Sequence, residues 1–568
     1  MQARSQRLRK LCEIGFANRS HYTGKASIET AFSFLEQIFR DAKWLGVGDR
    51  CVTTYHGCDI DDVAQLAMEF HQFSNQPNTF KHIFGDMKHR IADPYRGTFN
   101  MIAPGPDDDV DSKCFAYECL FNYVKDNADA IWHRGLKCFC LRHQGLCFCF
   151  DESDSDHDLA NEEEHFSVKD SYSNAETLAS LSDPDLHILS SEASTDSEAT
   201  LPMVSRGAAG ISGDNGGGSG SGSASSSSRN TIVQPRNAAA AATVDATEAG
   251  AVAEDDEDDD SADIEAANEK LRQWKRGRFR FWSGGTSCTD YAAYGAQQGA
   301  AGDTNAALIC FCGEIRAGKP DAVLMEITPS APVQIMMDKL GDKYGIFTTL
   351  ISPDNLGEPA SRLRRYSFLF NRETVAFRGS EDEYFKLFSR YCNLDADVYF
   401  ATSEAVRAAE ARKRCKKQGN VYGEDVMHIP VVDQLPTLGK ERYRNFMMVG
   451  NVRCGLSGCH TFDVEQNPSF CSSGWLMPAL VTHGAIVSGK YDVILAAREH
   501  MLVMGEPAIA GVGGQFGCCF QELVDELASS TFGQGSLKRL AGNAMHLSVA
   551  SSFLFYCLSN VELIYYAP

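Results

Sequence analysis

The chain has 568 residues, of which 43% are hydrophobic, so it is long enough for more than one domain and a sizeable core. Its net charge of −23 comes from residues 151–268, which hold 27 acidic and 4 basic residues, so the neutral remainder does not exclude a nucleic-acid partner. No apolar run follows the basic N-terminus and none reaches about 18 residues, so we expect neither a secretory signal nor a membrane span. Because no secretory signal is seen, we expect an intracellular protein whose 20 cysteines are reduced thiols.

Helix and strand patterns alternate in residues 1–150. Apolar residues at helical spacing predict a helix over 28–39, and a second helix is predicted over 63–70. Strands are predicted at 51–56 and 82–85, whereas the segment just before Tyr22 is poorly marked as a strand.

Residues 151–268 are of low complexity, with the runs DESDSDHD, GGGSGSGSASSSS and EDDEDDD. Such a composition buries too little apolar surface to offset the entropy of ordering, so we predict a disordered insertion. A solvated linker is the favoured interpretation, and contact of its acidic runs with basic proteins such as histone tails is the alternative.

The alternation continues beyond this segment. Strands are predicted at 279–283, 322–327, 345–352 and 365–371, with helices at 308–315 and 333–340. This spacing predicts an α/β fold with a parallel, doubly wound sheet, which binds ligands at the carboxyl ends of its strands.

Candidate catalytic residues follow these strands. Cys288 lies in the small-residue turn GGTSCTDY, where a thiolate can serve as a nucleophile. Glu326 ends the next strand, in LMEITPS, where a carboxylate needs a partner or a chemical role. Arg362 and Arg364 precede a further strand and could hold a base oxygen and orient Glu326. Taken singly, an inert thiol, a salt-bridged Glu and surface arginines are the alternatives.

The order GGTSCTDYAAYG, LMEITPS and LGEPASRLRR resembles the C5 cytosine-specific DNA methyltransferase family, with its cysteine loop, Glu-containing strand end and Arg-x-Arg segment. Other motifs of that family are resembled, in the same order, by SHYTGKASIE, HGCDIDDVAQ, HIFGDM, LAAREHMLVMGEP and LKRLAGNAMHLSVASSFLF. The resemblance implies a Rossmann-like class I methyltransferase sheet with helices on both faces and a small target-recognition domain.

The resemblance also implies the ligands. Gly24, Asp59 and Asp86 would line an S-adenosyl-L-methionine site, with Asn543 near it. An acidic residue that ends a strand can accept both ribose hydroxyls, as in dinucleotide folds.

For catalysis, the resemblance implies that the Cys288 thiolate adds to C6 of cytosine while Glu326 hydrogen-bonds the N3 and amino edge of the base. Arg364 would bind O2, supported by Arg362. A base inside double-stranded DNA cannot reach such a site, so the cytosine must be flipped out.

The sequence departs from the family pattern at several positions. Thr286–Ser287 replaces Pro-Pro, Thr289 replaces Gln, Ile327 replaces Asn and Ala360 replaces Gln. Val493 stands where an arginine is expected six residues before Glu499. The nucleophile, the Glu and both arginines are kept.

Two cysteine-rich stretches have weaker patterns. KCFCLRHQGLCFCF contains Cys140, His143 and Cys147, which could bind zinc with Cys114 or Cys119, but buried cysteines on a strand are favoured and no metal is assigned. CGLSGCH, with Cys454, Cys459 and His460, is weaker still as a metal site.

The basic run ARKRCKK, residues 411–417, lies in the presumptive recognition region. Phosphate contact, a nuclear-import signal and a solvated helix face stay open as its role. The expected organisation is a catalytic part with a Cys-rich insertion (1–150), the linker (151–268), the nucleophile-loop part (269–370), the recognition region (371–474) and a C-terminal catalytic part (475–568).

The favoured function is therefore cytosine-5 methylation of double-stranded DNA, in a nuclear protein. RNA is the alternative substrate, through the tRNA-methylating branch of the family, whose Cys-Phe-Thr tripeptide this sequence lacks. A catalytically silent binding protein is the other alternative, because the loop around Cys288 is substituted.

Overall fold

The computed structural model describes residues 2–21, 27–47, 49–59, 64–65, 67–68, 82–85, 87–91, 93–105, 107–132, 137–141, 145–148, 278–285, 291, 298–331, 333–454, 460–467, 474–506, 508 and 533–564. Gly24, Asp86, Cys288 and His143, and the whole of the predicted linker, lie outside these residues.

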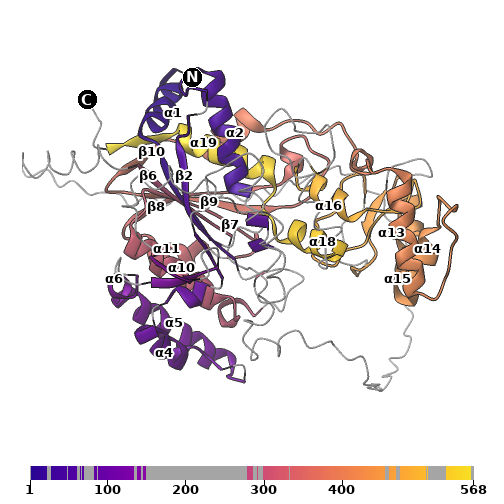
Figure 1. Ribbon diagram of the computed structural model, residues 1–568, viewed down its shortest axis with the longest axis horizontal. Helices are drawn as coiled ribbons and strands as arrows, with labels where there is room; N and C mark the ends of the chain where they lie inside the picture. Colours follow the sequence, from indigo (N-terminus) through magenta and orange to yellow (C-terminus); the bar gives the residue numbers. More distant parts are fainter. Residues whose placement is uncertain are drawn as a thin grey trace, which may run out of the picture. The chain divides into compact units, whose positions relative to one another are not determined.

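A seven-stranded sheet in the order β3-β2-β1-β6-β7-β9-β8 organises the fold (Figure 1). Its strands are β1 (Phe16–His21), β2 (Val52–Cys58), β3 (His82–Phe84), β6 (Phe279–Gly284), β7 (Ala322–Ile327), β8 (Tyr344–Ile351) and β9 (Arg364–Asn371). The predicted α/β class is confirmed, with a large, mostly parallel central sheet.

The expectation of an entirely parallel sheet is wrong for one strand. β9 pairs antiparallel with both β7 and β8, whereas the other neighbouring pairs are parallel. The connection from β8 to β9, residues 352–363, contains only the 3-10 turn η6 (Pro353–Asn355). A parallel neighbour would need a crossover connection, usually a helix, so the chain instead turns back and enters between β7 and β8.

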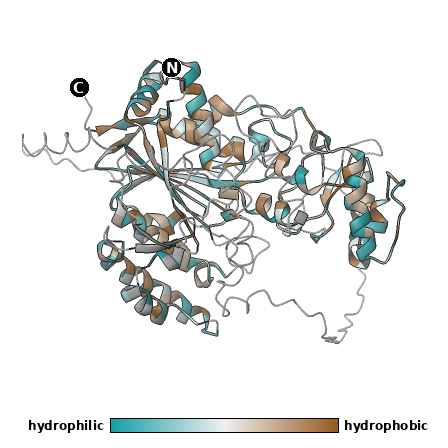
Figure 2. Ribbon diagram, viewed as in Figure 1, coloured by the Kyte–Doolittle hydropathy of each residue, from teal (hydrophilic) through white to brown (hydrophobic). Residues whose placement is uncertain are grey.

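Helices cover both faces of the sheet (Figure 1). One face packs on α1 (Gln2–Ile14), α2 (Ser27–Asp41) and α19 (Leu547–Ser559), and the other on α5 (Val110–Asp126), α10 (Asn305–Gly318) and α11 (Val333–Leu340). Successive side chains of a strand point to opposite faces of the sheet, so neighbouring residues of β7 pack in different cores. Leu324 packs on the face covered by α1, α2 and α19, and Met325 on the face covered by α5, α10 and α11. Figure 2 accordingly shows hydrophobic residues along the strands and hydrophilic ones on outer helices such as α1.

The other elements lie around this sheet. They are α4 (Asp93–Ile102), α6 (Ala128–Ile131), α12 (Glu381–Phe388), α13 (Glu404–Lys417), α14 (Val431–Gln434), α15 (Thr437–Cys454), α16 (Ala497–Val503), α18 (Gly533–Asn543), β4 (Lys137–Cys140), β5 (Gly145–Phe148), β10 (Val375–Phe377), β11 (Thr461–Asp463), β12 (Ile486–Ser488), β13 (Val493–Ile494), β14 (Val561–Leu563), and the 3-10 turns η1 (Met87–Arg90), η5 (Gly299–Ala301) and η7 (Ala396–Tyr399). Among the described residues, none of the helices combines the length and the hydropathy needed to cross a bilayer.

A small separate core forms in the expected recognition region. It joins α14 and α15 to the antiparallel sheet β11-β12-β13 through Val431, Leu435, Phe446, Phe462, Val464, Ala485, Val487 and Ile494. This core draws on residues 431–494, so it reaches beyond residue 474. The domain boundaries stay predictions.

A buried histidine in α16 gives the protein a testable pH dependence. Burial, with Lys538 nearby, lowers the pKa of His500 to about 3, so His500 stays neutral in the folded chain. In the unfolded chain His500 takes up a proton below its ordinary pKa of about 6.5. The contribution of the neutral His500 to the free energy of unfolding is therefore complete above that pH and is lost as the pH falls below it.

We expect His500→Gln to remove this pH-dependent contribution to the free energy of unfolding. Between pH 7.5 and 5.5, the free energy of unfolding should fall by about 1.4 kcal/mol less in the variant than in the wild type. Chemical denaturation at the two pH values measures the difference, and equal changes in the two proteins would contradict the assignment.

Candidate active site

The carboxyl ends of five neighbouring strands form one continuous row. Phe84 of β3 pairs with Cys58 of β2, Cys58 with His21 of β1, His21 with Gly284 of β6, and Gly284 with Met325 of β7. The residues that follow these positions in the chain therefore emerge along the same edge of the sheet.

The middle of this row is the point where the strand order reverses. From β1 the chain builds outward to β2 and β3, and from β6 it builds in the other direction to β7. Open α/β sheets bind ligands in the crevice at such a switch point. The backbone N–H of Gly285 donates to the His21 carbonyl over 3.2 Å, so the segments that lead to Gly24 and to Cys288 leave the sheet side by side.

Glycine is required where the cysteine segment leaves β6. A Cβ atom at Gly284 would lie 2.8 Å from ring atoms of Phe311, a fully buried residue of α10. This close approach lets α10 pack directly beneath the strand end. Cys288 follows four residues later and lies outside the described residues.

Glu326 and Arg364 meet at the same edge. The Arg364 Nε lies 3.1 Å from the Glu326 Oε1, and the two side chains are 20% and 10% exposed. The antiparallel pairing of Glu326 with Tyr366 produces this contact, because Arg364 lies two residues from Tyr366 on the same face of β9. A partly exposed carboxylate beside a guanidinium offers hydrogen-bond acceptors and donors to a planar heterocycle.

Arg362 has different partners. Its guanidinium is buried and donates to the carbonyls of Leu480 (3.2 Å), Gly542 (2.9 Å) and Ala544 (3.0 Å). It therefore holds the chain on both sides of Asn543. These contacts support a positioning role for Arg362.

Asn543 lies near the start of α2. The hydroxyl of Ser27, the first residue of α2, donates to the Met545 carbonyl over 3.1 Å. Asn543 itself is exposed, and Gly24 lies three residues before Ser27, outside the described residues. The structure thus brings the segment containing Asn543 to the helix that follows the predicted glycine loop.

Asp59 lies one residue beyond the row. Its backbone N–H donates to the Phe84 carbonyl over 3.2 Å and its carbonyl accepts from the Gln65 side chain over 2.7 Å, and the residue is 8% exposed. Asp86, the predicted adenine contact, follows β3 but lies outside the described residues.

Beneath the row is a buried charged cluster that the sequence analysis missed. Arg90 Nη1 donates to Glu314 Oε2 over 3.0 Å and lies 3.1 Å from His21 Nδ1, and all three side chains are at most 1% exposed. Burial, and then the charge of Arg90, lowers the pKa of His21 well below its usual value, so a neutral His21 accepts from Arg90. The cluster ties the end of β1 to η1 and α10. Its only sequence signal is a charge in the apolar segment around Glu314.

Glu499 explains one departure from the family pattern. Its carboxylate accepts from the backbone N–H groups of Thr402 and Ala496, each over 2.7 Å, and lies 3.5 Å from Arg407 Nε. Val493 stands where the family pattern has an arginine, and it carries no charge. The arginine that faces Glu499 is instead Arg407 of α13.

The cysteine-rich stretch forms a hairpin of β4 and β5, in which Cys138 lies opposite Cys147. His143 lies outside the described residues. No group of three potential ligands suited to a metal ion occurs among the residues that the structure describes. His460, of the second stretch, packs on the ring of Phe462.

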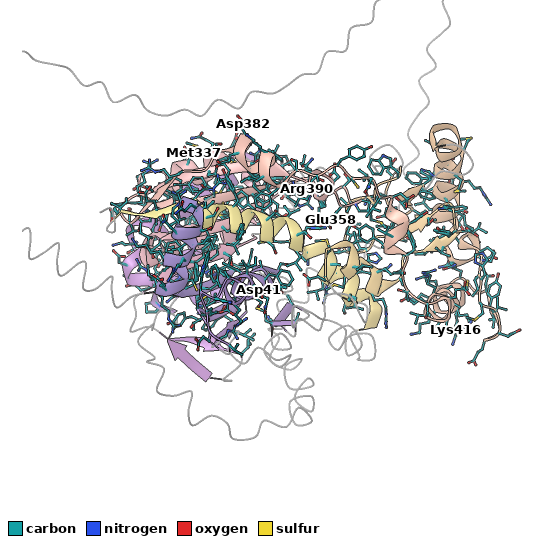
Figure 3. All side chains as sticks on the ribbon, turned by 90° about the horizontal axis from the view of Figure 1, so that it is seen from above. Asp41, Met337, Glu358, Asp382, Arg390 and Lys416 are labelled. Carbon is teal, nitrogen blue, oxygen red and sulfur yellow. The ribbon has the colours of Figure 1, made fainter. Side chains whose placement is uncertain are left out.

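The basic run ends α13 and divides into two kinds of side chain. Arg412 donates to the Glu424 and Val426 carbonyls, and Arg414 pairs with Glu410. The lysines at 413, 416 and 417 are exposed, and Lys416 is labelled at the outer end of this region in Figure 3. Only the lysines are therefore available for a phosphate.

Neither a protein-family model nor a curated protein matches this sequence. Solved structures similar to it include the S. pombe Dnmt2 methyltransferase (14% identity, 49% of this chain and 77% of that chain, TM-score 0.27). Others are the Entamoeba histolytica methyltransferase EhMeth (12%, 51% and 79%, TM-score 0.29) and a protein described as a DNA modification methyltransferase from an E. coli prophage (13%, 51% and 82%, TM-score 0.30). All three are described as methyltransferases. The function proposed below rests on the chain's own residues and topology.

Proposed function

We propose that this protein transfers a methyl group from S-adenosylmethionine to carbon 5 of a flipped-out cytosine in DNA. The observation that carries the proposal is the Glu326–Arg364 pair, which lies one strand away from the point where the Cys288 segment leaves β6. A pair suited to the polar edge of cytosine thus lies on β9 and on β7, the strand next to β6, from which the segment with the predicted nucleophile continues.

The residues at the β1–β2 end suit the cofactor. Asp59 offers a carboxylate to hydroxyl donors at a strand end, and α2 begins just past the predicted glycine loop. When bound there, the cofactor supplies an electrophilic methyl group. Asn543 lies on a segment held by both Ser27 and Arg362.

Each catalytic residue has a distinct role in this proposal. The Cys288 thiolate adds to C6, which makes C5 nucleophilic, while Glu326 hydrogen-bonds N3 and the amino group and Arg364 binds O2. C5 takes the methyl group, its proton is lost to a base, and the C6–sulfur bond breaks. A flipped base is needed because a base stacked inside a duplex cannot reach groups at the strand ends of a sheet.

Asp59→Ala should weaken binding of S-adenosylmethionine at least tenfold, about 1.4 kcal/mol, because the ribose hydroxyls lose their acceptor. Isothermal titration calorimetry measures this, and Asp41→Ala, at the exposed end of α2 (labelled in Figure 3), is the control. Unchanged affinity in Asp59→Ala would remove Asp59 from the cofactor site.

The proposed function is tested by incubating the protein with S-adenosylmethionine that carries a labelled methyl group. Separate reactions contain duplex DNA, tRNA transcripts or no nucleic acid. We expect 5-methylcytosine in the DNA. Product in tRNA alone would assign the protein to the tRNA-methylating branch, and cofactor binding without product in either would support the silent binding protein.

A further inference from the structure

Tyr291 lies three residues after Cys288 and has two fixed contacts. Its hydroxyl donates to Oδ1 of Asn305, the first residue of α10, over 2.9 Å. Its carbonyl accepts a hydrogen bond from the hydroxyl of Ser330. These contacts join the chain beyond the cysteine to the start of α10 and to the connection from β7 to α11.

Asn305 is well suited to hold a partner in one place. Its Nδ2 donates to the carbonyls of Gly299 and Gly302, each over 2.9 Å, and the residue is only 7% exposed. With both donors engaged, the amide cannot flip, so its oxygen always faces the Tyr291 hydroxyl.

Ser330 connects this contact to the base-binding pair. It lies in the connection from β7 to α11, four residues after Glu326. Tyr291 is therefore linked to the strand that carries Glu326, while Gly285, at the other end of the cysteine segment, is bonded to His21.

Both ends of the segment 285–291 are thus anchored. Cys288 is three residues from each anchor, so its Cα lies within about 11 Å of both, because an extended chain spans at most ~3.6 Å per residue. Fixing the two ends limits where the thiol can lie relative to Glu326.

We propose that Tyr291 and Asn305 form a latch that positions Cys288 for attack on the base. This inference rests on the proposed function and makes Tyr291 a positioning residue that acts through the loop. Tyr291 lies within the motif GGTSCTDYAAYG, but the sequence resemblance assigns no role to Tyr291 or to Asn305.

Tyr291→Phe tests the latch, because it removes one hydroxyl and keeps the ring. Covalent trapping of a 5-fluorocytosine DNA duplex, at saturating duplex and S-adenosylmethionine, should slow about fivefold, as expected for one lost hydrogen bond. Binding of S-adenosylmethionine should be unchanged. Tyr123→Phe is the matched control: Tyr123 packs against the same core as Tyr291 and its hydroxyl donates to the Tyr95 carbonyl over 3.3 Å, away from the loop.

Two further measurements separate a latch from general destabilisation. Tyr291→Phe and Tyr123→Phe should shift the melting temperature alike, but only Tyr291→Phe should speed hydrogen exchange in a peptide covering residues 285–298. In an Asn305→Ala background, Tyr291→Phe should slow trapping no further, since the two residues form one contact.

Wild-type trapping and exchange rates in Tyr291→Phe would overturn the latch. If the wild type itself does not trap the duplex, the proposed function fails. Faster exchange in Tyr291→Phe would then still establish the latch, and unchanged exchange would refute it.

Discussion

Replacing Cys288 by alanine is expected to abolish methyl transfer and covalent trapping while leaving S-adenosylmethionine binding intact. A thiolate forms a covalent bond to C6 that Thr286, Ser287 and Thr289 cannot replace, because hydroxyls are poor nucleophiles without a neighbouring base. Methyl transfer to duplex DNA and calorimetry of the cofactor measure the two properties.

Cys114→Ala is the matched control. Cys114 is a partly exposed thiol in α5, and its loss should leave transfer unchanged. Wild-type methylation of DNA by Cys288→Ala would place the nucleophile elsewhere or refute the family resemblance.

The second large effect is expected for Glu326→Gln, which should slow methyl transfer about 10²-fold or more. The amide keeps the size of the side chain but removes the negative charge that faces Arg364 at 3.1 Å and that, under the proposed function, stabilises the activated cytosine. Thermal unfolding should change little, and single-turnover kinetics at saturating DNA measure the rate.

Glu373→Gln controls for the loss of an ion pair as such. Glu373 pairs with Lys343 over 3.2 Å, and both side chains are more than half exposed, so this substitution should leave the rate unchanged. If Glu326→Gln kept the wild-type rate, Glu326 would have no part in activating the base.

Most of the sheet could be predicted because its strands are apolar and regularly spaced, but β1 could not. All six of its residues are buried, yet four of them, Asn18 to His21, are polar. Their partners lie on other elements: Asn18 donates to Glu29 and to Thr54, and the hydroxyl of Ser20 lies 2.9 Å from that of Ser283. Hydropathy cannot reveal a buried strand whose polar groups are satisfied by tertiary contacts.

The candidate site, like the sheet, could be predicted only in part. The motif order predicts that Glu326 and Arg364 act together, and the structure joins them. The sequence groups Arg362 with Arg364 as a residue that could orient Glu326, but the carbonyl partners of Arg362 come from the chain more than a hundred residues later. Such partners, like the Arg407 that faces Glu499, depend on tertiary packing and have no local signal.

The most direct test of the proposed function is incubation of the wild type with S-adenosylmethionine and a DNA duplex containing 5-fluorocytosine. Fluorine at C5 cannot leave as a proton does, so the enzyme should remain bonded to the base. We predict a denaturation-resistant complex whose cross-linked peptide contains Cys288. A protein that binds S-adenosylmethionine, yet forms no such complex with the duplex, would contradict cytosine-5 methylation of DNA by this chain.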